Sequence, residues 1–197
     1  MTKAYLLGAL HDGTIRRLTY RIVQKDREYI ELLLTGILSL GQKAWMYQEG
    51  KKRNLFVVEF SKSLLKDFVI LTQQDKIDYI QGYFDAEGGI SRNPQVRYYI
   101  YFAQKNLNDL LEVKRYLEEF GIICGKIHNP SKKVDPAYWR FFISIKSYKK
   151  FAQLIGSWHP IKCHYLKDED IVHASSNGRN NMNKVSLAEA EDGSPPF

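Results

Sequence analysis

Two acidic residues, Asp12 and Glu87, occupy matching places in two similar stretches of this chain. The stretches read YLLGALHDG over residues 5–13 and YIQGYFDAEG over residues 79–88, so each is an apolar run with an internal glycine, an acid and a following glycine. Such runs predict helices that pack closely through small residues and bring their C-terminal ends together. Two carboxylates beside two negative helix ends repel each other. A bound Mg²⁺, with Mn²⁺ as a substitute, would relieve that repulsion.

The chemistry that fits such a pair of acids is phosphodiester hydrolysis. Mg²⁺ keeps several waters and takes phosphate oxygens from a substrate as further ligands. One or two such ions can polarise a phosphate and supply hydroxide for in-line attack. An ordinary polar helix end explains either acid alone, but the repetition of the whole pattern favours a metal site. Asp85 has no counterpart in the first stretch, and we expect it to cap a helix or to hydrogen bond locally.

Two Gln-Lys pairs supply further groups for this chemistry. Gln24-Lys25 and Gln104-Lys105 lie 80 residues apart, each at the end of a predicted strand. Lysine can stabilise charge that develops on a phosphate, and glutamine can orient water or substrate. A polar helix N-terminus explains either pair alone, whereas the repetition in register favours function. His11 has no counterpart in the second stretch, so we expect it to pack or to support the neighbouring acid.

The elements that position these residues occur twice in the same order. Hydrophobic periodicity, N-cap residues and terminal glycines define them. The first half predicts a helix at 3–12, an extended segment at 14–24, a helix from the N-cap Asp26 to Leu40 and Gly41, strands at 43–48 and 54–60 joined by a hairpin at 49–52, and a helix from Ser61 to about Leu71. The second half predicts a helix at 77–87, extended segments around Asn93-Pro94 that reach Gln104, a helix from Asn106 or Asn108 to Phe120-Gly121, strands at 122–128 and 138–145, and a helix at 147–155.

Each half is therefore an αββαββα unit. Two long repeats indicate a duplicated pseudo-dimer rather than a solenoid, so the expected fold class is α+β with pseudo-twofold symmetry. We expect an N-terminal half at 1–71, a linker at 72–76, a C-terminal half at 77–160 and an extension at 161–197. The end of the extension is rich in Ser, Asn, Gly and acids, which predicts loose order.

Basic and polar side chains are concentrated on the predicted strands. Because strand side chains alternate, one face of each sheet would pack on helices while the other stays polar and basic. A twisted antiparallel ribbon fits the major groove of DNA, where Arg reaches guanine, Gln reaches adenine, and Tyr or Lys bonds phosphates. For any one residue, a solvated sheet face with cross-strand pairs is an equal alternative. The expected DNA-contacting residues are Arg16, Arg17, Thr19, Tyr20, Arg21, Lys43, Trp45, Tyr47, Arg92, Gln95, Arg97, Tyr99, Tyr101, Lys126, His128 and Arg140.

The charge balance agrees with a polyanionic partner. The formal net charge is +7 and the pI is about 9.2. Residues 168–197 carry six acidic and two basic side chains, so the remainder of the chain is more basic than the total. A basic body with 13 tyrosines is typical of nucleic-acid binding, although a soluble protein with a basic surface is an equal explanation of the charge alone.

The cysteines and the chain start indicate the compartment. Cys124 and Cys163 form no CxxC pair and the five histidines show no zinc-ligand spacing, so no structural zinc is expected. We expect two buried free thiols, with a disulfide between them as the alternative. The N-terminus lacks a signal-peptide pattern, and no apolar run approaches the ~20 residues of a membrane span. We therefore expect a soluble, intracellular, cytoplasmic protein with no membrane partner.

These residues resemble the single-chain LAGLIDADG homing endonucleases of the small archaeal intron-encoded kind. Residues 80–88 are similar to the family motif, and residues 6–13 match it more weakly, because the glycine precedes the acid by four residues instead of five. The resemblance covers about residues 3–160. It implies two antiparallel sheets that form a saddle over DNA, a long and nearly asymmetric target, and cleavage of both strands across the minor groove to leave 3′ overhangs.

The resemblance also implies roles for particular residues. The expected protein is a monomeric, Mg²⁺-dependent, site-specific endonuclease that acts on double-stranded DNA. An RNA maturase that binds a group I intron and an inactive DNA-binding relative are alternatives that keep the fold. Asp12 and Glu87 would bind the metal ions, and the catalytic partners would be Gln24, Lys25, Gln104 and Lys105, with Lys62 and Lys146 as other positions for the central lysine.

Overall fold

The first half of the chain folds around one antiparallel sheet. The computed structural model describes residues 1–50, 53–91 and 98–167. The first sheet has the strand order β1-β2-β4-β3, and helix α2 packs its apolar side on it through Tyr29, Ile30, Leu33 and Ile37. The elements are α1 (Lys3–Ala9), η1 (Leu10–Asp12), β1 (Gly13–Ile15), β2 (Thr19–Gln24), α2 (Arg27–Ser39), β3 (Ala44–Gln48), β4 (Phe56–Ser61) and η2 (Lys62–Leu65).

The second half repeats this plan with a smaller sheet of strand order β5-β6-β7. Its core is rich in aromatic rings, among which Phe102 and Phe141 stack with centroids 5.2 Å apart. The two halves therefore have separate cores on either side of the central helices. The elements are α3 (Gln73–Glu87), β5 (Gly88–Ile90), β6 (Ile100–Gln104), α4 (Leu107–Glu119), β7 (Trp139–Phe142), η3 (Ile145–Ser147), α5 (Tyr148–Leu154) and α6 (Pro160–Tyr165).

The helix boundaries of the repeat follow from capping residues that recur in both halves. The Asp26 side chain accepts the backbone N–H of Tyr29 at the start of α2, and Asn106 does the same for Asn108 at the start of α4. Beyond the ends of these helices, Gly41 and Gly121 have φ of 75° and 68°, a conformation that glycine adopts without strain. The capping predictions from the sequence are confirmed.

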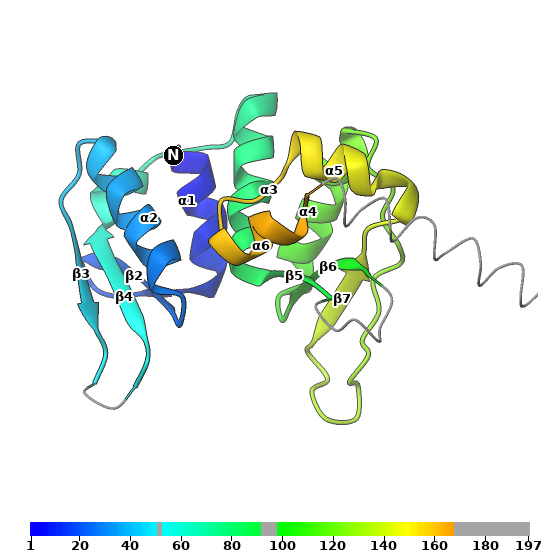
Figure 1. The fold of residues 1–197 in the computed structure, drawn as a ribbon, viewed down its shortest axis with the longest axis horizontal. Coiled ribbons are helices and arrows are strands. Elements are labelled where there is room, and N and C mark those ends of the chain that lie inside the picture. Colours follow the sequence, from blue (N-terminus) through cyan, green and yellow to red (C-terminus); the bar gives the residue numbers. More distant parts are fainter. Residues whose placement is uncertain (51–52, 92–97, 168–197) are drawn as a thin grey trace, which may run out of the picture.

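Helices α1 and α3 form a close pair at the centre of the molecule. A Cβ atom on Gly8 would collide with the carbonyl oxygen of Tyr79, and one on Gly82 would collide with the carbonyl oxygen of Tyr5. Glycine at both positions therefore lets the two backbones touch, as the sequence pattern predicts. The pair separates the two halves of the fold, and their C-terminal ends lie together (Figure 1).

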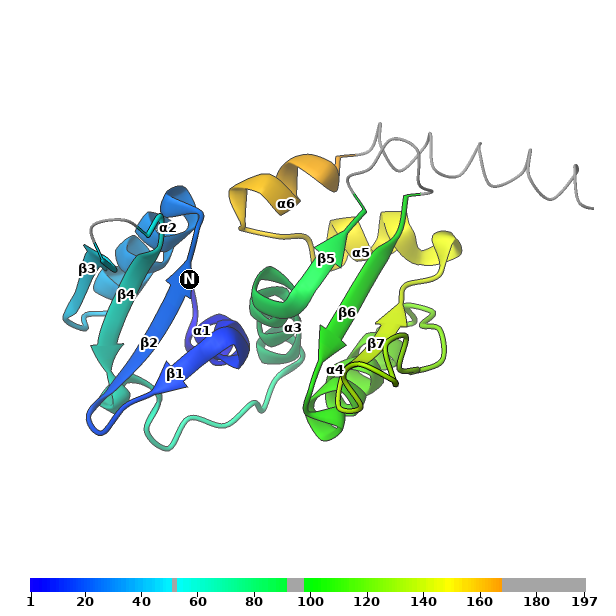
Figure 2. The ribbon, with the colours of Figure 1, turned by 90° about the horizontal axis from the view of Figure 1, so that it is seen from below.

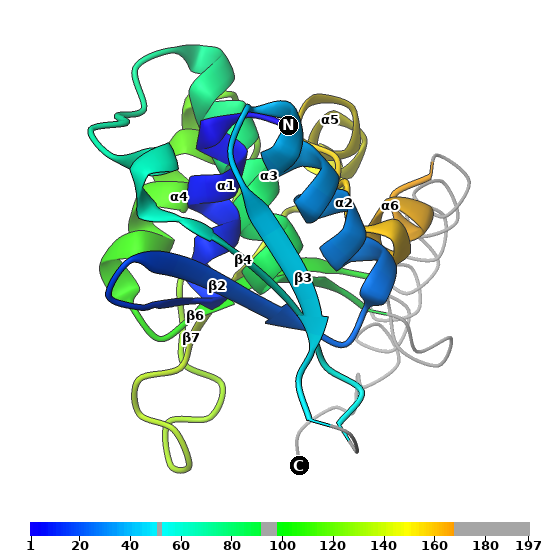
Figure 3. The same cartoon turned by 90° about the vertical axis from the view of Figure 1, so that its left-hand side faces the viewer.

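The two sheets lie on opposite sides of this helix pair and open away from it. Figure 2 shows β1, β2 and β4 beside α1, and β5, β6 and β7 beside α3. The end-on view in Figure 3 shows the helices above and the strands below, with the loop that precedes β7 extending beyond the sheets. The predicted α+β architecture, with two antiparallel sheets in a saddle-like arrangement, is confirmed.

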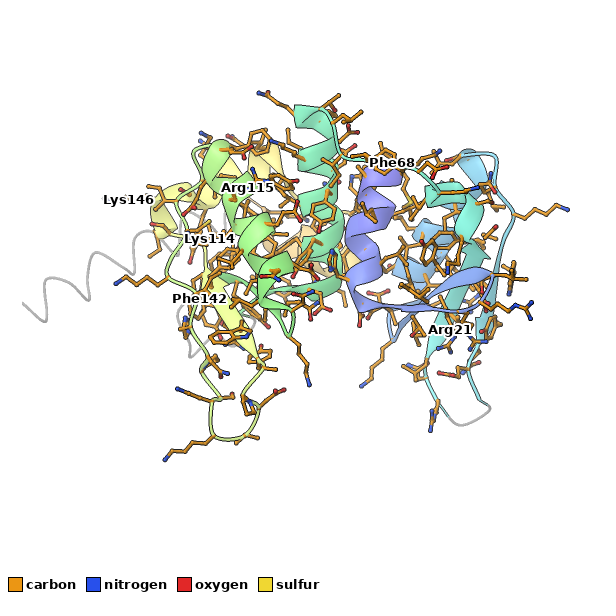
Figure 4. The ribbon with its side chains drawn as sticks, turned by 180° about the vertical axis from the view of Figure 1, so that it is seen from behind. Arg21, Phe68, Lys114, Arg115, Phe142 and Lys146 are labelled. Atoms are coloured by element: carbon orange, nitrogen blue, oxygen red, sulfur yellow. The ribbon has the colours of Figure 1, made fainter. Side chains whose placement is uncertain are left out.

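The connection between the halves differs from the sequence prediction. The helix expected from Ser61 to about Leu71 is only the short turn η2, and the linker expected at 72–76 is largely the first turn of α3. The connection instead runs through residues 66–71, where Phe68 and Ile70 pack against the second core. Burial of these two side chains favours extended chain there, and Figure 4 shows Phe68 near the helix pair. Thr72 and Asp75 form a capping box that starts α3 early.

The strand expected at 122–128 is also irregular. Its pairing consists of isolated bridges, from Cys124 to Ile143 just after β7 and from His128 to Arg140 within β7. Between these two bridges, the chain advances four residues from Cys124 to His128 but only three from Arg140 to Ile143. The 122–128 segment therefore carries the extra residue of a bulge. Both cysteines are free, as expected, but neither is buried as expected, because Cys124 is half-buried and Cys163 is exposed. In the described part of the chain, no helix has the length and apolar character that crossing a membrane requires.

Candidate active site

Asp12 and Glu87 come together where α1 and α3 meet. Asp12 is the last residue of η1, directly after α1, and Glu87 is the last residue of α3. Burial raises the pKa of Glu87 to about 7, and the charge of Asp12 adds to the shift. Asp12 has more contact with solvent, yet the protein around its carboxyl group still raises its pKa to about 6. The predicted juxtaposition of two acids is therefore present.

Each acid is bonded by the glutamine of its own half. Gln24 Nε2 donates to Asp12 Oδ2, and Gln104 Nε2 donates to Glu87 Oε1 over 2.9 Å. The sheet register explains the match, because the glycine after each acid pairs with the strand residue two positions before the glutamine. The Gln104 bond opposes the rise in the Glu87 pKa, since it stabilises the ionised carboxylate.

The lysines expected beside these glutamines lie farther out. Lys25 and Lys105 are both exposed, and Lys105 Nζ forms an ion pair with Asp135 over 3.1 Å. Lys62 donates to the carbonyl oxygen of Arg16 over 3.4 Å, and Figure 4 shows Lys146 on the outer side of the second half, away from the helix pair. The structure thus brings both glutamines to the acids, and it brings none of these four lysines into a described bond with them.

His11 bridges the two halves and does not pair with Asp12. Its Nε2 lies 2.7 Å from the Tyr79 hydroxyl, and its Nδ1 lies 3.4 Å from Asp109. The ring also packs against Tyr83, with centroids 4.4 Å apart. Burial lowers the pKa of His11, while the charge of Asp109 opposes that shift. These contacts agree with the packing role expected from the sequence.

Two buried residues near the acids differ from the sequence analysis: Asp85, expected to cap a helix or to bond locally, bonds distant segments instead, and Lys162 was not predicted. Asp85 is 1% exposed and accepts hydrogen bonds from Tyr5 and from residues 157–159. Lys162, which is 8% exposed, donates to backbone carbonyls at the end of α3. The charge of Lys162 lowers the pKa of both acids against the effect of burial. The sequence signal that could have identified Lys162 is its position in a short helix after the repeat, two residues beyond the Pro160 that starts this helix.

The donor set at this point fits a divalent cation that also binds a substrate. Among the residues that the structure describes, no group of three or more His, Cys, Asp or Glu side chains gathers as a self-contained metal site. Two neighbouring carboxylates, both with a raised proton affinity, are nevertheless suited to Mg²⁺, because this ion keeps waters and takes phosphate oxygens as further ligands. A cation would offset the repulsion between Asp12 and Glu87, which contributes to the raised pKa of Glu87.

The outer face of the first sheet carries a network of charged side chains. Arg21 donates to Glu49 over 2.7 Å and to the Tyr47 hydroxyl over 3.3 Å. Glu59 in turn accepts from Thr19 over 2.5 Å and from Tyr47 over 3.1 Å. Figure 4 shows the position of Arg21 on this sheet. Arg21 is therefore held in one orientation before any ligand arrives.

The remaining predicted contacts of the first half divide between the two faces. Lys43, Trp45 and Tyr47 are exposed on the outer side, and Arg16 and Arg17 lie exposed in the turn between β1 and β2. Tyr20 instead faces the helices and packs on Phe60, with ring centroids 5.7 Å apart. The alternation along β2 places Tyr20 on the core face because Ile22 on the same face is fully buried.

The outer face of the second sheet is aromatic rather than acidic. The guanidinium carbon of Arg140 lies 4.5 Å from the ring centroid of Tyr101, and Arg140 also donates to the Tyr138 hydroxyl. Tyr99 and Phe142 extend this cluster, with ring centroids 5.4 Å apart. Lys126 and His128 are exposed beside it, and the predicted contacts Arg92, Gln95 and Arg97 lie outside the described residues.

The fold places one acid at the end of each of two closely packed helices. Residues 75–156 match the family model described as a LAGLIDADG-like domain. The solved structures that match include the homing endonuclease I-DmoI, whose fold is similar to that of this chain. No curated protein sequence matches significantly.

Two groups of solved structures share the fold. I-DmoI in complex with DNA and Mn has 23% sequence identity and a TM-score of 0.58 over 78% of this chain and 95% of that chain. Mesophilic variants of I-DmoI give a TM-score of 0.62 at 22% identity, over 83% of this chain and 95% of that one. Full-length DUF199/WhiA from Thermatoga maritima gives a TM-score of 0.66 at 17% identity, over 95% of this chain and 66% of that one. The fold is therefore shared with a second group of proteins that is not described as endonucleases.

Proposed function

We propose that this protein is a monomeric, site-specific endonuclease that hydrolyses both strands of a double-stranded DNA target with divalent metal ions. The observation that carries the proposal is the duplicated acid–glutamine pair: Asp12 with Gln24, and Glu87 with Gln104. One chain supplies both pairs, so a single molecule has one acid for each strand. The I-DmoI complexes with DNA and Mn or Mg, which share the fold, support both the ligand and the metal.

The acids would hold the metal ions, with Mg²⁺ as the expected ion and Mn²⁺ as a substitute. When bound, such ions polarise a phosphate and lower the pKa of a bound water. Gln24 and Gln104 each engage one oxygen of their acid, which fixes the orientation of the carboxylate. Lys25 and Lys105 are exposed one residue further on, where a flexible ammonium can reach a backbone phosphate.

The two outer sheet faces would divide DNA recognition between them. The first carries the polar Thr19 and Tyr47 around a fixed Arg21 that is 9% exposed, and these side chains suit hydrogen bonding to base edges and phosphates. The second presents aromatic rings around Arg140. Because the faces differ in chemistry, the favoured target is asymmetric. The basic body of the chain would make the affinity strongly dependent on salt.

A second candidate function, binding of intron RNA, is favoured by the aromatic cluster on the second sheet. Proteins recognise unpaired RNA bases by stacking them on aromatic side chains and on arginine planes. Tyr99, Tyr101 and Phe142 lie around Arg140 on the outer face and supply both kinds of surface. The duplicated acids have no role in that function, so we rank it second.

Cleavage of genomic DNA from the source organism tests the proposal. The protein is incubated with that DNA and Mg²⁺, and the new ends are sequenced. We expect one or a few sites with 3′ overhangs, and we expect Asp12→Asn and Glu87→Gln to abolish cleavage. Asp67→Asn is the matched control, because Asp67 lies exposed in the connection between the halves. Promotion of intron splicing without any DNA cleavage would replace this proposal with the RNA function, and normal cleavage by either acid variant would refute the assignment of the acids.

A further inference from the structure

Lys162 is a buried lysine whose ammonium group donates hydrogen bonds to backbone carbonyls next to Glu87. Its Nζ donates to the carbonyl oxygens of Phe84 and Asp85 over 2.8 Å each, and to that of Gly88 over 2.7 Å. An ammonium has three donors, and three backbone carbonyl oxygens lie within hydrogen-bond distance of it. The acceptors are the last turn of α3 and the first residue of β5. Lys162 therefore closes the end of the helix that carries Glu87.

The position of this charge matters because the site is otherwise negative. The C-terminal ends of two helices point toward Asp12 and Glu87, and helix C-termini carry partial negative charge. A positive charge bonded to the carbonyls of α3 offsets that field directly. Consistent with this, Lys162 acts against the rise in the pKa of both acids. No other lysine in the described part of the chain is as deeply buried beside α3.

The segment that delivers Lys162 is anchored on the same turn of α3. The backbone N–H groups of Trp158 and His159 donate to Asp85 Oδ2 over 2.9 and 3.2 Å, and the Ser157 hydroxyl donates to Oδ1. From the first half of the chain, the Tyr5 hydroxyl donates to the same carboxylate over 2.5 Å. Asp85 thus joins α1, α3 and the segment before α6 at one buried point.

Aromatic stacking extends this anchor onto the first half. Trp158 stacks on Tyr5, and His159 stacks on Tyr29, each with ring centroids 4.6 Å apart. Figure 2 shows α6 lying across the end of the molecule where the two halves meet. Residues 157–165 therefore bridge both halves before they present Lys162 to the end of α3.

We propose that Lys162 is a positioning residue for the carboxylate pair, which holds the last turn of α3 so that Glu87 stays opposite Asp12. This inference rests on the proposed nuclease function for its consequence in catalysis. Lys162 donates to backbone carbonyls at the end of α3, so its proposed action is through the position of Glu87. Because the sheets bind the DNA, its loss changes the chemical step and leaves DNA binding largely intact.

Local hydrogen exchange gives a readout that does not require activity. The Gly88 N–H donates to the Phe84 carbonyl, which is also an acceptor of Lys162. In Lys162→Met, which keeps the length of the side chain and removes its charge and donors, we expect exchange at residues 84–90 to accelerate at least tenfold more than in α2. Lys162→Arg, which keeps the charge, should restore exchange to within about threefold of the natural protein. Lys149→Met, at an exposed site on α5, is the matched control.

Cleavage kinetics complete the test, at a temperature where every variant is folded. We expect kcat of Lys162→Met to fall at least tenfold with KM for DNA changed less than threefold, and Lys162→Arg to recover most of the loss. If Lys162→Met does not fold, Lys162→Gln takes its place, because it keeps two N–H donors while it removes the charge and shortens the side chain. Uniform acceleration of exchange across the chain, or unchanged kcat despite local acceleration, would overturn the inference. If the natural protein cuts no DNA, the proposed function fails first, and local acceleration would then show that Lys162 has a structural role only.

Discussion

Gln104 donates a hydrogen bond to Glu87 over 2.9 Å, and Gln24 makes the equivalent bond to Asp12 in the other half. The equivalence follows from the register, because Gly13 pairs with Ile22 and Gly88 pairs with Phe102. Each glutamine therefore reaches back to the acid across one strand pair. Two copies of this relationship in one chain indicate two related half-sites.

Removal of one glutamine should slow one half-site more than the other. A net hydrogen bond to a charged group contributes about 1.5–3 kcal/mol, which corresponds to roughly 10- to 100-fold in rate if it is lost in the transition state. We expect Gln104→Leu and Gln24→Leu to affect opposite strands of the target. End-labelled duplexes that resolve nicks in each strand provide the measurement. Equal loss in both strands from each variant would contradict the assignment of one acid to one strand.

The raised pKa values of the two acids predict a dependence of stability on pH. Burial raises the pKa of Asp12 from 3.8 to about 6 and that of Glu87 from 4.5 to about 7. The charge of Asp12 adds to the rise in the pKa of Glu87. A carboxyl group with a raised pKa binds its proton more tightly when folded, so its contribution to stability is present below about pH 4 and is lost as the pH rises through 6 to 7. Without divalent ions, Tm should therefore fall across this window relative to Asp12→Asn/Glu87→Gln.

Thermal unfolding at several pH values measures this difference, and metal addition supplies the control. Ions that bind the ionised acids stabilise the folded state by mass action, so Mn²⁺ should raise Tm of the natural protein above pH 7. The double variant should not respond to Mn²⁺. Parallel pH profiles for the natural protein and the double variant would show that the two acids do not titrate as proposed.

The sequence predicts the acids and glutamines well because both depend on local pattern. A glycine-containing apolar run places an acid at a helix end, and a strand of fixed length returns a glutamine to it. The sequence predicts the surroundings less well because they depend on contacts between distant segments. Phe68 and Ile70 extend the connection by packing on the second core, and Lys162 reaches α3 from a helix beyond the repeat. The hydrophobic periodicity of a sequence does not indicate which distant backbone carbonyl a lysine will bond.

The contact between α1 and α3 predicts an unusual response to alanine. Glycine to alanine inside a helix ordinarily stabilises by about 0.5–1 kcal/mol, because glycine has the higher entropy cost. At Gly8 and Gly82, a Cβ atom would meet backbone atoms of the partner helix, which cannot move aside as a side chain can. We expect Gly82→Ala to destabilise the protein by about 1–3 kcal/mol or more through overpacking. Denaturant unfolding measures the change, and Gly125→Ala, where a Cβ would be 3.4 Å from its nearest neighbour, is the control. Equal effects at both sites would argue against a close helix contact.

The ordered Arg21 predicts a specific change in DNA binding. Arg21 is held by Glu49 and Tyr47 on the outer face of the first sheet, so little side-chain entropy remains to be lost when it binds DNA. If Arg21 contacts a phosphate, Arg21→Ala should lower affinity and reduce the slope of log K against log salt concentration by about 1. If it reads a base, the slope should change little and discrimination at one base pair should fall by about 1–3 kcal/mol.

Fluorescence anisotropy with Ca²⁺ in place of Mg²⁺, on the target and on singly substituted duplexes, distinguishes a phosphate contact from a base contact. Lys146→Ala is the matched control, because Lys146 lies on the outer side of the second half, away from the helix pair. If Arg21→Ala binds every duplex with the affinity of the natural protein, Arg21 does not contribute to the DNA interface.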